Sequence, residues 1–138
     1  MLNLGSPFTI DHIGIVVDAL DSAVALYCSL LGVKPEAVEY HDVPTEKVRV
    51  AMLKGNTIVE LLEPTEEGTG LAKFREKRGA GVHHICYAAP APLQAKLDQL
   101  KAAGLALLDE SPRTGADGKV FFVHPKSCGG VLVEFVER

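Results

Sequence analysis

Two histidines and two glutamates, side chains that can bind a metal ion, lie one pair in each half of the chain. His12 and Glu60 lie in the first half of the chain, and His84 and Glu134 lie in the second, each within an apolar, β-branched run typical of a buried strand. A carboxylate buried without a partner is costly or becomes protonated, so both glutamates need a cation. Two neutral imidazoles and two carboxylates suit one divalent first-row ion, with two octahedral positions left open. The sequence therefore predicts a four-residue metal site.

The spacing of these residues repeats between the two halves. From His12 to Glu60 is 48 residues and from His84 to Glu134 is 50, and the two extra residues fall in the Gly-rich loop 124–130. A glycine that ends a predicted helix follows each histidine by 20 residues. A single His or Glu in a strand is more often structural, but the matched register indicates a duplicated unit that carries a site.

Strand-like and helix-like runs come in the same order in both halves. The first half contains one predicted helix, from Leu20 to Leu31, which Asp18 or Asp21 can cap and Gly32 ends. The helix of the second half begins after Pro92 and ends at Gly104. Strands are predicted within 8–17, 38–40, 48–53, 57–62, 81–87, 106–108, 120–123 and 131–136.

These elements predict an α+β fold made of two tandem βαβββ modules, about 8–64 and 81–137, joined by a linker, 65–80. We expect residues 1–138 to form a single domain with a curved mixed sheet around a central metal cleft. A pseudo-twofold arrangement would bring the two histidines and two glutamates to one axis. In the linker, Leu71 and Phe74 share one helix face, and the basic residues around them are typical of a solvated face.

The composition limits the class of protein. Of 138 residues, 47% are apolar and 23% are charged, which is ordinary for a globular chain. A net charge of -4 gives no global attraction for nucleic acid or an anionic membrane, and no apolar run is long enough to span a bilayer. We therefore expect a cytoplasmic protein. Cys28, Cys86 and Cys128 are widely spaced and odd in number, which argues against a disulfide framework and a zinc-thiolate site.

The remaining histidines are weaker candidates. His83 has the wrong strand parity to share a face with His84, so we expect it to be structural or to support a ligand. His41 is predicted in a loop or on an edge strand. His124 and Lys126 lie in the Gly-rich loop and are candidates to bind a carboxylate or phosphates of the substrate, with a plain turn role as the alternative.

At these residues the sequence resembles the vicinal oxygen chelate superfamily and, within it, the methylmalonyl-CoA epimerases. The resemblance covers nearly the whole chain. It is carried by Asp-His-Ile-Gly-Ile-Val-Val at 11–17, Ile-Val-Glu-Leu-Leu-Glu-Pro at 58–64, the linker at 71–79 that leads into Gly-Val-His-His-Ile at 81–85, and most specifically His-Pro-Lys-Ser-Cys-Gly-Gly-Val-Leu-Val-Glu at 124–134.

The resemblance implies a metal-dependent proton transfer at C2 of methylmalonyl-CoA, with His12, Glu60, His84 and Glu134 as ligands and Glu134 as one base. Some relatives carry a glutamate at the position that aligns with Val50, which cannot move a proton. This departure leaves Glu60, Glu46 or a bound water as candidates for the second base, or places the protein in a subgroup whose second base differs. The metal can be cobalt, manganese, zinc, nickel or magnesium, the preference between methylmalonyl and ethylmalonyl thioesters stays open, and the superfamily implies a homodimer.

Other functions fit the same pattern. A glyoxalase I-type lactoylglutathione lyase can use the same four ligand types, although the linker and the Gly-rich loop speak against it. An extradiol dioxygenase needs two histidines and one carboxylate, so the second glutamate disfavours it. From another class, a metal-free small-molecule-binding protein of this fold would have no reason to keep four ligands.

Overall fold

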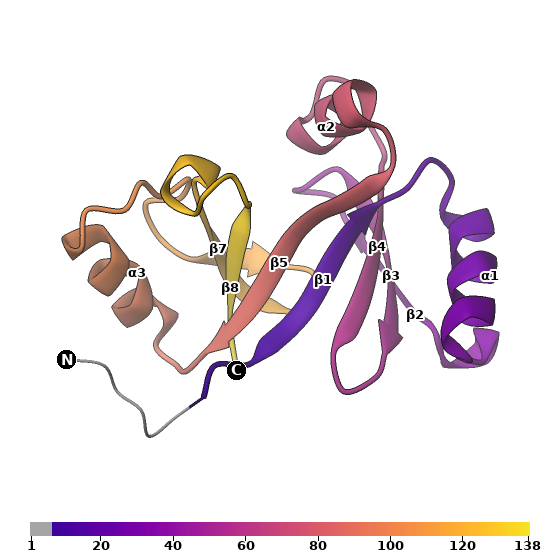
Figure 1. Ribbon diagram of the computed structural model, residues 1–138, viewed down its shortest axis with the longest axis horizontal. Coiled ribbons are helices and arrows are strands. Elements are labelled where there is room, and N and C mark those ends of the chain that lie inside the picture. Colours follow the sequence, from indigo (N-terminus) through magenta and orange to yellow (C-terminus); the bar gives the residue numbers. More distant parts are fainter. Residues whose placement is uncertain (1–6) are drawn as a thin grey trace.

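The computed structural model describes residues 7–138, which form one mixed eight-stranded sheet with three α-helices (Figure 1). The first half contains β1 (Ile10–Val16), α1 (Leu20–Leu31), β2 (Glu39–Val43), β3 (Val48–Lys54) and β4 (Ile58–Pro64). Helix α2 (Gly70–Arg78) lies in the linker. The second half contains β5 (Gly81–Ala89), α3 (Leu93–Ala102), β6 (Arg113–Gly115), β7 (Gly118–Val123) and β8 (Val133–Glu137).

The strand order shows the duplication and explains how the site is assembled. The order is β2-β3-β4-β1-β5-β8-β7-β6, with β1 parallel to β4, β5 parallel to β8, and β1 antiparallel to β5. The two histidine-bearing strands therefore form the centre of the sheet, and the two glutamate-bearing strands flank them on opposite sides. The curved sheet and the βαβββ order in each half confirm the predicted α+β fold.

The strand predicted at 106–108 is reduced to a single bridge. Leu107 pairs with Val123, and backbone hydrogen bonds join Leu108 to Phe122 and His124 to Ala106, but the edge strand of the second half is β6, which forms a hairpin with β7. Gly118, with φ +114°, allows the tight turn of that hairpin. Leu105 and Leu107 also pack against the core around α3. His41 lies on β2, an edge strand as expected.

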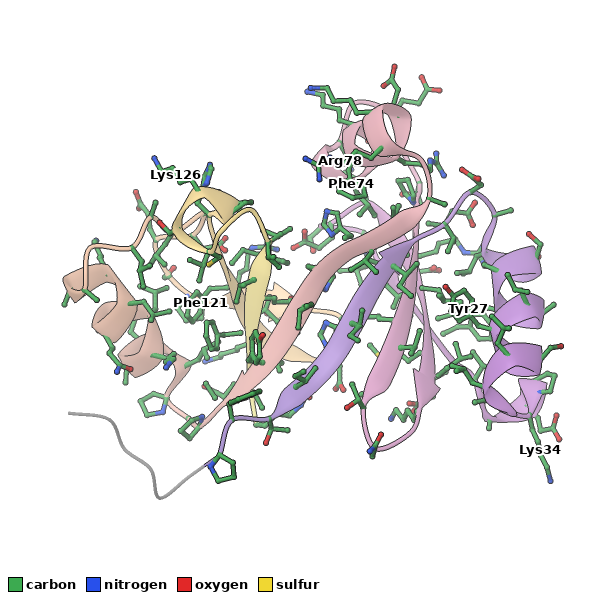
Figure 2. The ribbon with its side chains drawn as sticks, in the orientation of Figure 1. Tyr27, Lys34, Phe74, Arg78, Phe121 and Lys126 are labelled. Carbon is green, nitrogen blue, oxygen red and sulfur yellow. The ribbon has the colours of Figure 1, made fainter. Side chains whose placement is uncertain are left out.

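Helices α1 and α3 cover the sheet at opposite ends of the molecule (Figure 1). Leu20, Val24 and Cys28 of α1 pack on strands β3 and β4. Leu93 and Leu97 of α3 pack on β7, and Figure 2 shows Phe121 between this helix and the sheet. In the part of the chain that the structure describes, no helix is long and apolar enough to cross a membrane.

Each of these helices is capped by a glutamate from a distant strand. Glu63 Oε1 accepts a hydrogen bond from the backbone N–H of Leu20 at 3.2 Å, and Glu137 Oε2 accepts one from Leu93 at 2.9 Å. The expectation that Asp18 or Asp21 caps the first helix is therefore wrong, since its cap position, Ala19, has no side-chain cap and the carboxylate arrives from β4. Gly32 ends the same helix in the left-handed conformation, as predicted.

Replacing Glu137 by alanine is expected to lower the free energy of unfolding by about 1 kcal/mol, because the first N–H groups of α3 lose an anionic acceptor. Denaturant unfolding followed by circular dichroism measures the change. Glu137→Gln retains an acceptor oxygen and should lose less. The exposed Glu110→Ala is the control, and an equal loss in both alanine variants would contradict the capping role.

Candidate active site

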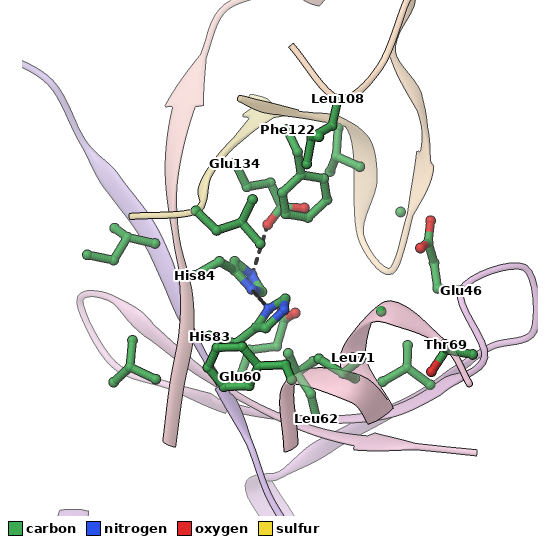
Figure 3. Close-up of a pocket in the computed structure, with 18 of the residues that line it drawn as sticks. Glu46, Glu60, Leu62, Thr69, Leu71, His83, His84, Leu108, Phe122 and Glu134 are labelled. Carbon is green, nitrogen blue, oxygen red and sulfur yellow. Dashed lines mark hydrogen bonds and ion pairs between the residues drawn. The ribbon is translucent and has the colours of Figure 1, made fainter. Parts of the chain in front are cut away.

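The four predicted ligands meet at the centre of the sheet. His12 comes from β1, Glu60 from β4, His84 from β5 and Glu134 from β8, and each is only 4–7% exposed. The His12 and His84 Nε2 atoms lie 3.2 Å apart, and Glu134 Oε1 lies 2.9 Å from the first and 3.1 Å from the second. Glu60 Oε2 lies 3.5 Å from His12 Nε2. Figure 3 shows His84, Glu60 and Glu134 turned towards one cavity.

These separations fit the first coordination sphere of a divalent ion. Metal–ligand bonds of about 2.1 Å place neighbouring ligands of an octahedron about 3.0 Å apart. The four separations given above, three of which involve His12 Nε2, run from 2.9 to 3.5 Å. His12, Glu60 and His84 also satisfy the geometric criterion for a metal-binding group. The chemistry of the donor set and its spacing therefore both fit the ion that the sequence predicts.

Hydrogen bonds on the Nδ1 side of the ring orient His12. Its Nδ1–H donates to Asp11 Oδ2 at 2.7 Å, and Arg138 Nε donates to Asp11 Oδ1 at 2.8 Å. A carboxylate on Nδ1 fixes the imidazole tautomer and leaves Nε2 as the ligand atom, which is the usual support of a metal-bound histidine. Burial raises the pKa of Asp11, but the hydrogen bonds from His12 and Arg138 outweigh it and lower that pKa.

Replacing Asp11 by asparagine is expected to weaken metal binding about 10–100-fold, because the amide orients and polarises His12 less well than a carboxylate does. Competition with a fluorescent chelator measures the affinity for cobalt. Asp117 also pairs with Arg138 but is not hydrogen-bonded to His12, so Asp117→Asn is the matched control. Equal affinities in the two variants would show that the hydrogen bond from His12 to Asp11 has no influence on the ligand.

The two glutamates have different electrostatic surroundings. Burial raises the pKa of Glu134, but hydrogen bonds from His12 and His84 outweigh it and lower the pKa to about 2. Burial dominates for Glu60, whose pKa is raised. Burial lowers the pKa of His12, whereas its bonds to Asp11 and Glu134 raise it more, to about 12. Without an ion, a protonated His12 thus bridges the Asp11 and Glu134 carboxylates through its two N–H groups, and a metal bound at Nε2 must displace the Nε2 proton.

A bulge in β5 changes the position of His83. Gly14 pairs with His84 and Ile15 pairs with Val82, so His83 is an extra residue without a partner on β1. The parity argument assumed a regular strand and is wrong here, because His83 lines the same cavity as His84. Its Nδ1 lies 3.0 Å from His84 Nδ1, and its ring meets the Phe74 ring edge-on. Burial lowers the pKa of His83 to about 4.

The site opens into a cavity of about 830 Å³ between the two halves of the sheet and α2. One wall is apolar and includes Val50, which is 1% exposed and packs with Val48, Met52 and Leu62. The cavity wall therefore has no titratable group at position 50.

An ion pair lies farther along the same cavity. Glu46 pairs with Arg113, whose Nε also donates to Asp109 at 2.8 Å and whose guanidinium stacks on Phe122. Figure 3 shows Glu46 away from His83 and His84, on the other side of the cavity. The charge of the Glu46 carboxylate is thus balanced by Arg113, which Asp109 and Phe122 hold in place.

The structure does not bring His124 and Lys126 to the metal residues. Their neighbours Pro125 and Gly130 line the cavity, but neither of the two side chains does. His124 Nδ1 accepts the backbone N–H of Lys126 at 3.0 Å, which caps a short 3₁₀ helix, and Figure 2 shows Lys126 at the surface. Their role in substrate binding stays a prediction.

Comparison with known proteins assigns the family. A family model described as the glyoxalase/bleomycin resistance protein/dioxygenase superfamily matches residues 11–122. The ethylmalonyl-CoA/methylmalonyl-CoA epimerase of Cereibacter sphaeroides is 43% identical over 129 residues, which cover 91% of this chain and 94% of that protein. The human mitochondrial methylmalonyl-CoA epimerase is 41% identical over 96% of this chain and 73% of its own length. The chain belongs to this superfamily and to its methylmalonyl-CoA epimerase family.

Solved structures agree with this assignment. A methylmalonyl-CoA epimerase in complex with methylmalonyl-CoA and NH4+ superposes with a TM-score of 0.86 at 37% identity, over 96% of this chain and 95% of that one. The epimerase from Mycobacterium tuberculosis has the same TM-score at 32% identity, over 99% and 92% of the two chains. The recognised family and the predicted fold are thereby confirmed.

Three residues of the site were not identified from the sequence. Asp11 and Arg113 orient other groups, and Gly14 makes room, because a Cβ built on it would lie 2.1 Å from His84 Cε1. An isolated glycine inside a strand often marks a close approach of this kind, so the sequence did contain that signal. Cys86 lies beside His12, but burial raises the pKa of its thiol to about 12, which makes it a poor ligand.

Proposed function

We propose that this protein is a metal-dependent epimerase that interconverts (R)- and (S)-methylmalonyl-CoA by moving a proton at C2. The observation that carries the proposal is the convergence of His12, Glu60, His84 and Glu134 at one end of a cavity, in a chain 41–43% identical to named methylmalonyl-CoA epimerases. Neither the four residues nor the similarity to these relatives decides between methylmalonyl and ethylmalonyl thioesters, since the Cereibacter relative is named for both.

A divalent ion bound by the four residues would act as a Lewis acid on the thioester and carboxylate oxygens beside C2, which acidifies the C–H bond between them. Nitrogen and oxygen donors of this kind accept cobalt, manganese, zinc, nickel or magnesium. His12 and His84 would hold that ion in place beside Glu60 and Glu134, which would present C2 to these carboxylates in one pose.

Inversion at C2 needs a proton-transferring group on each face of the carbon. Glu60 and Glu134 lie on β4 and β8, which flank the central pair of strands on opposite sides. In the proposed reaction Glu134 removes the proton from one face and Glu60 returns one to the other, with the roles exchanged for the opposite enantiomer. Val50 is apolar and Glu46 is paired with Arg113, which favours Glu60 over Glu46 as the second group.

The test is proton NMR of methylmalonyl-CoA in deuterated water, with the protein and added cobalt. The C2 signal should disappear, and a chelator should stop the loss until metal is restored. Activity on the glutathione hemithioacetal of methylglyoxal, with none on methylmalonyl-CoA, would assign the chain to the lyase class. Protein that takes up no divalent metal after soaking would support a binding protein.

We also propose a cytoplasmic homodimer, which the family resemblance supports. Sedimentation velocity at micromolar concentration gives the assembly state, and a monomer throughout the range would contradict the homodimer.

A further inference from the structure

Three cations of α2 line the outer part of the cavity. Lys73, Lys77 and Arg78, named here the α2 basic face, belong to the residues that enclose the same space as Glu60 and Glu134. The helical spacing of i, i+4 and i+5 places them on one side of α2, while Arg75 points elsewhere and donates to the carbonyl of Val17. The basic run that the sequence marked as a solvated face thus also borders the cavity.

These cations have no acidic partner. Each of the three is exposed, and none forms an ion pair with a carboxylate among residues 7–138. Arg78 is nevertheless held in place, since its guanidinium lies 5.4 Å above the Phe74 ring. In a chain of net charge -4, three unpaired cations at one rim form a local site for a polyanion.

The cavity is far larger than the reacting group. An acyl thioester of eight non-hydrogen atoms occupies at most roughly 250 Å³, at about 30 Å³ for each water-sized group. The cavity measures about 830 Å³. Besides the buried glutamates, its lining includes the exposed apolar side chains Val82, Leu108 and Val131 and the α2 basic face. An apolar passage that ends in cations suits a ligand with a neutral arm and an anionic end.

We propose that the α2 basic face binds the phosphate groups of the CoA part of the substrate. The inference rests on the proposed function for the identity of the thioester. CoA carries a diphosphate and a 3′-phosphate at the end of a neutral pantetheine arm, which matches a cavity lined by both exposed apolar side chains and unpaired cations. The α2 basic face therefore contributes to affinity and stays apart from the proton transfer.

The experiment compares two thioesters of methylmalonate, one with CoA and one with pantetheine, which lacks the nucleotide and its phosphates. In Lys73→Ala/Lys77→Ala, KM for the CoA thioester should rise roughly tenfold at low salt, with kcat unchanged and with no change for the pantetheine thioester. The Lys73→Arg/Lys77→Arg variant keeps both charges and should restore KM. Lys34→Ala, at the far end of α1 in Figure 2, is the matched control.

Calorimetric titration with CoA alone separates this inference from the proposed function. CoA binding that weakens in the double alanine variant supports the α2 basic face even if the protein epimerises neither thioester, which would overturn the proposed function only. Unchanged KM and unchanged CoA affinity in a folded double variant overturn the inference. Equal impairment with both thioesters overturns it as well, because the cations would then act on the acyl end or on the fold.

Discussion

Replacing Gly14 by alanine is expected to reduce metal affinity by about 100-fold or more and to remove most of the epimerase activity. Gly14 lies in register with Glu60 on one side and His84 on the other. A Cβ built on Gly14 would lie 2.1 Å from Cε1, 2.5 Å from Nδ1 and 2.6 Å from Nε2 of the His84 ring. All three distances are shorter than van der Waals contact, so the imidazole must move off the position it shares with His12 and Glu134.

Metal titration of the purified variant, together with its C2 exchange rate, measures the effect. Gly81→Ala is the matched control, since Gly81 lies in the adjacent strand and its Cβ would meet nothing within 4 Å. Overpacking of the variant should cost about 1–3 kcal/mol of stability, which a denaturation curve reports separately. Normal cobalt affinity in Gly14→Ala would show that His84 is not a ligand.

The duplicated pattern allowed much of the site to be predicted from the sequence. His12, Glu60, His84 and Glu134 were predicted from matched spacing, and the structure brings all four together. Side chains alternate between the two faces of a strand. Matching apolar runs in the two halves therefore place equivalent residues on the same face of the sheet. The order of elements in each half followed from the same repetition.

The features that sequence analysis missed depend on contacts between distant segments or on irregular backbone. His83 lies on the cavity side because of a bulge, and no periodicity of the sequence marks that bulge. The helix cap from Glu63 joins residues 43 positions apart. Strand β6 forms because a glycine turn folds it onto β7, while the more apolar residues before it, Leu105 and Leu107, pack towards α3.

The two halves also differ where the metal residues are supported. Cys86 occupies the position in the second half that Gly14 occupies in the first, and it pairs with His12 as Gly14 pairs with His84. The His84 ring therefore lies over bare backbone, whereas the His12 ring lies beside a thiol and is held by Asp11. The ring planes meet at 87°, which lets both Nε2 atoms approach one carboxylate oxygen. A duplicated sequence thus forms a site whose two halves are not equivalent.

Glu134→Gln is expected to slow exchange of the C2 hydrogen about 10²–10⁴-fold, because an amide cannot accept the proton. The amide oxygen can still face His12 and His84, so metal affinity should fall much less than the exchange rate. Burial raises the pKa of Glu134, but the hydrogen bonds from His12 and His84 outweigh it and lower that pKa to about 2, so the carboxylate is ionised at neutral pH. In Glu60→Gln, the second face of C2 loses its proton-transferring group. Interconversion of the enantiomers should therefore slow more than exchange of the C2 hydrogen with solvent.

The measurement is deuterium incorporation at C2 followed by NMR, starting separately from each enantiomer, with the metal content of each sample determined beforehand. Glu137→Gln lies on the same strand, three residues on, and keeps its acceptor for α3, so it is the matched control. Glu134→Gln protein that binds cobalt normally and exchanges C2 at the original rate would remove Glu134 from the reaction. Loss of exchange from one enantiomer alone, with Glu60→Gln affecting the other, would establish that the two glutamates act on opposite faces.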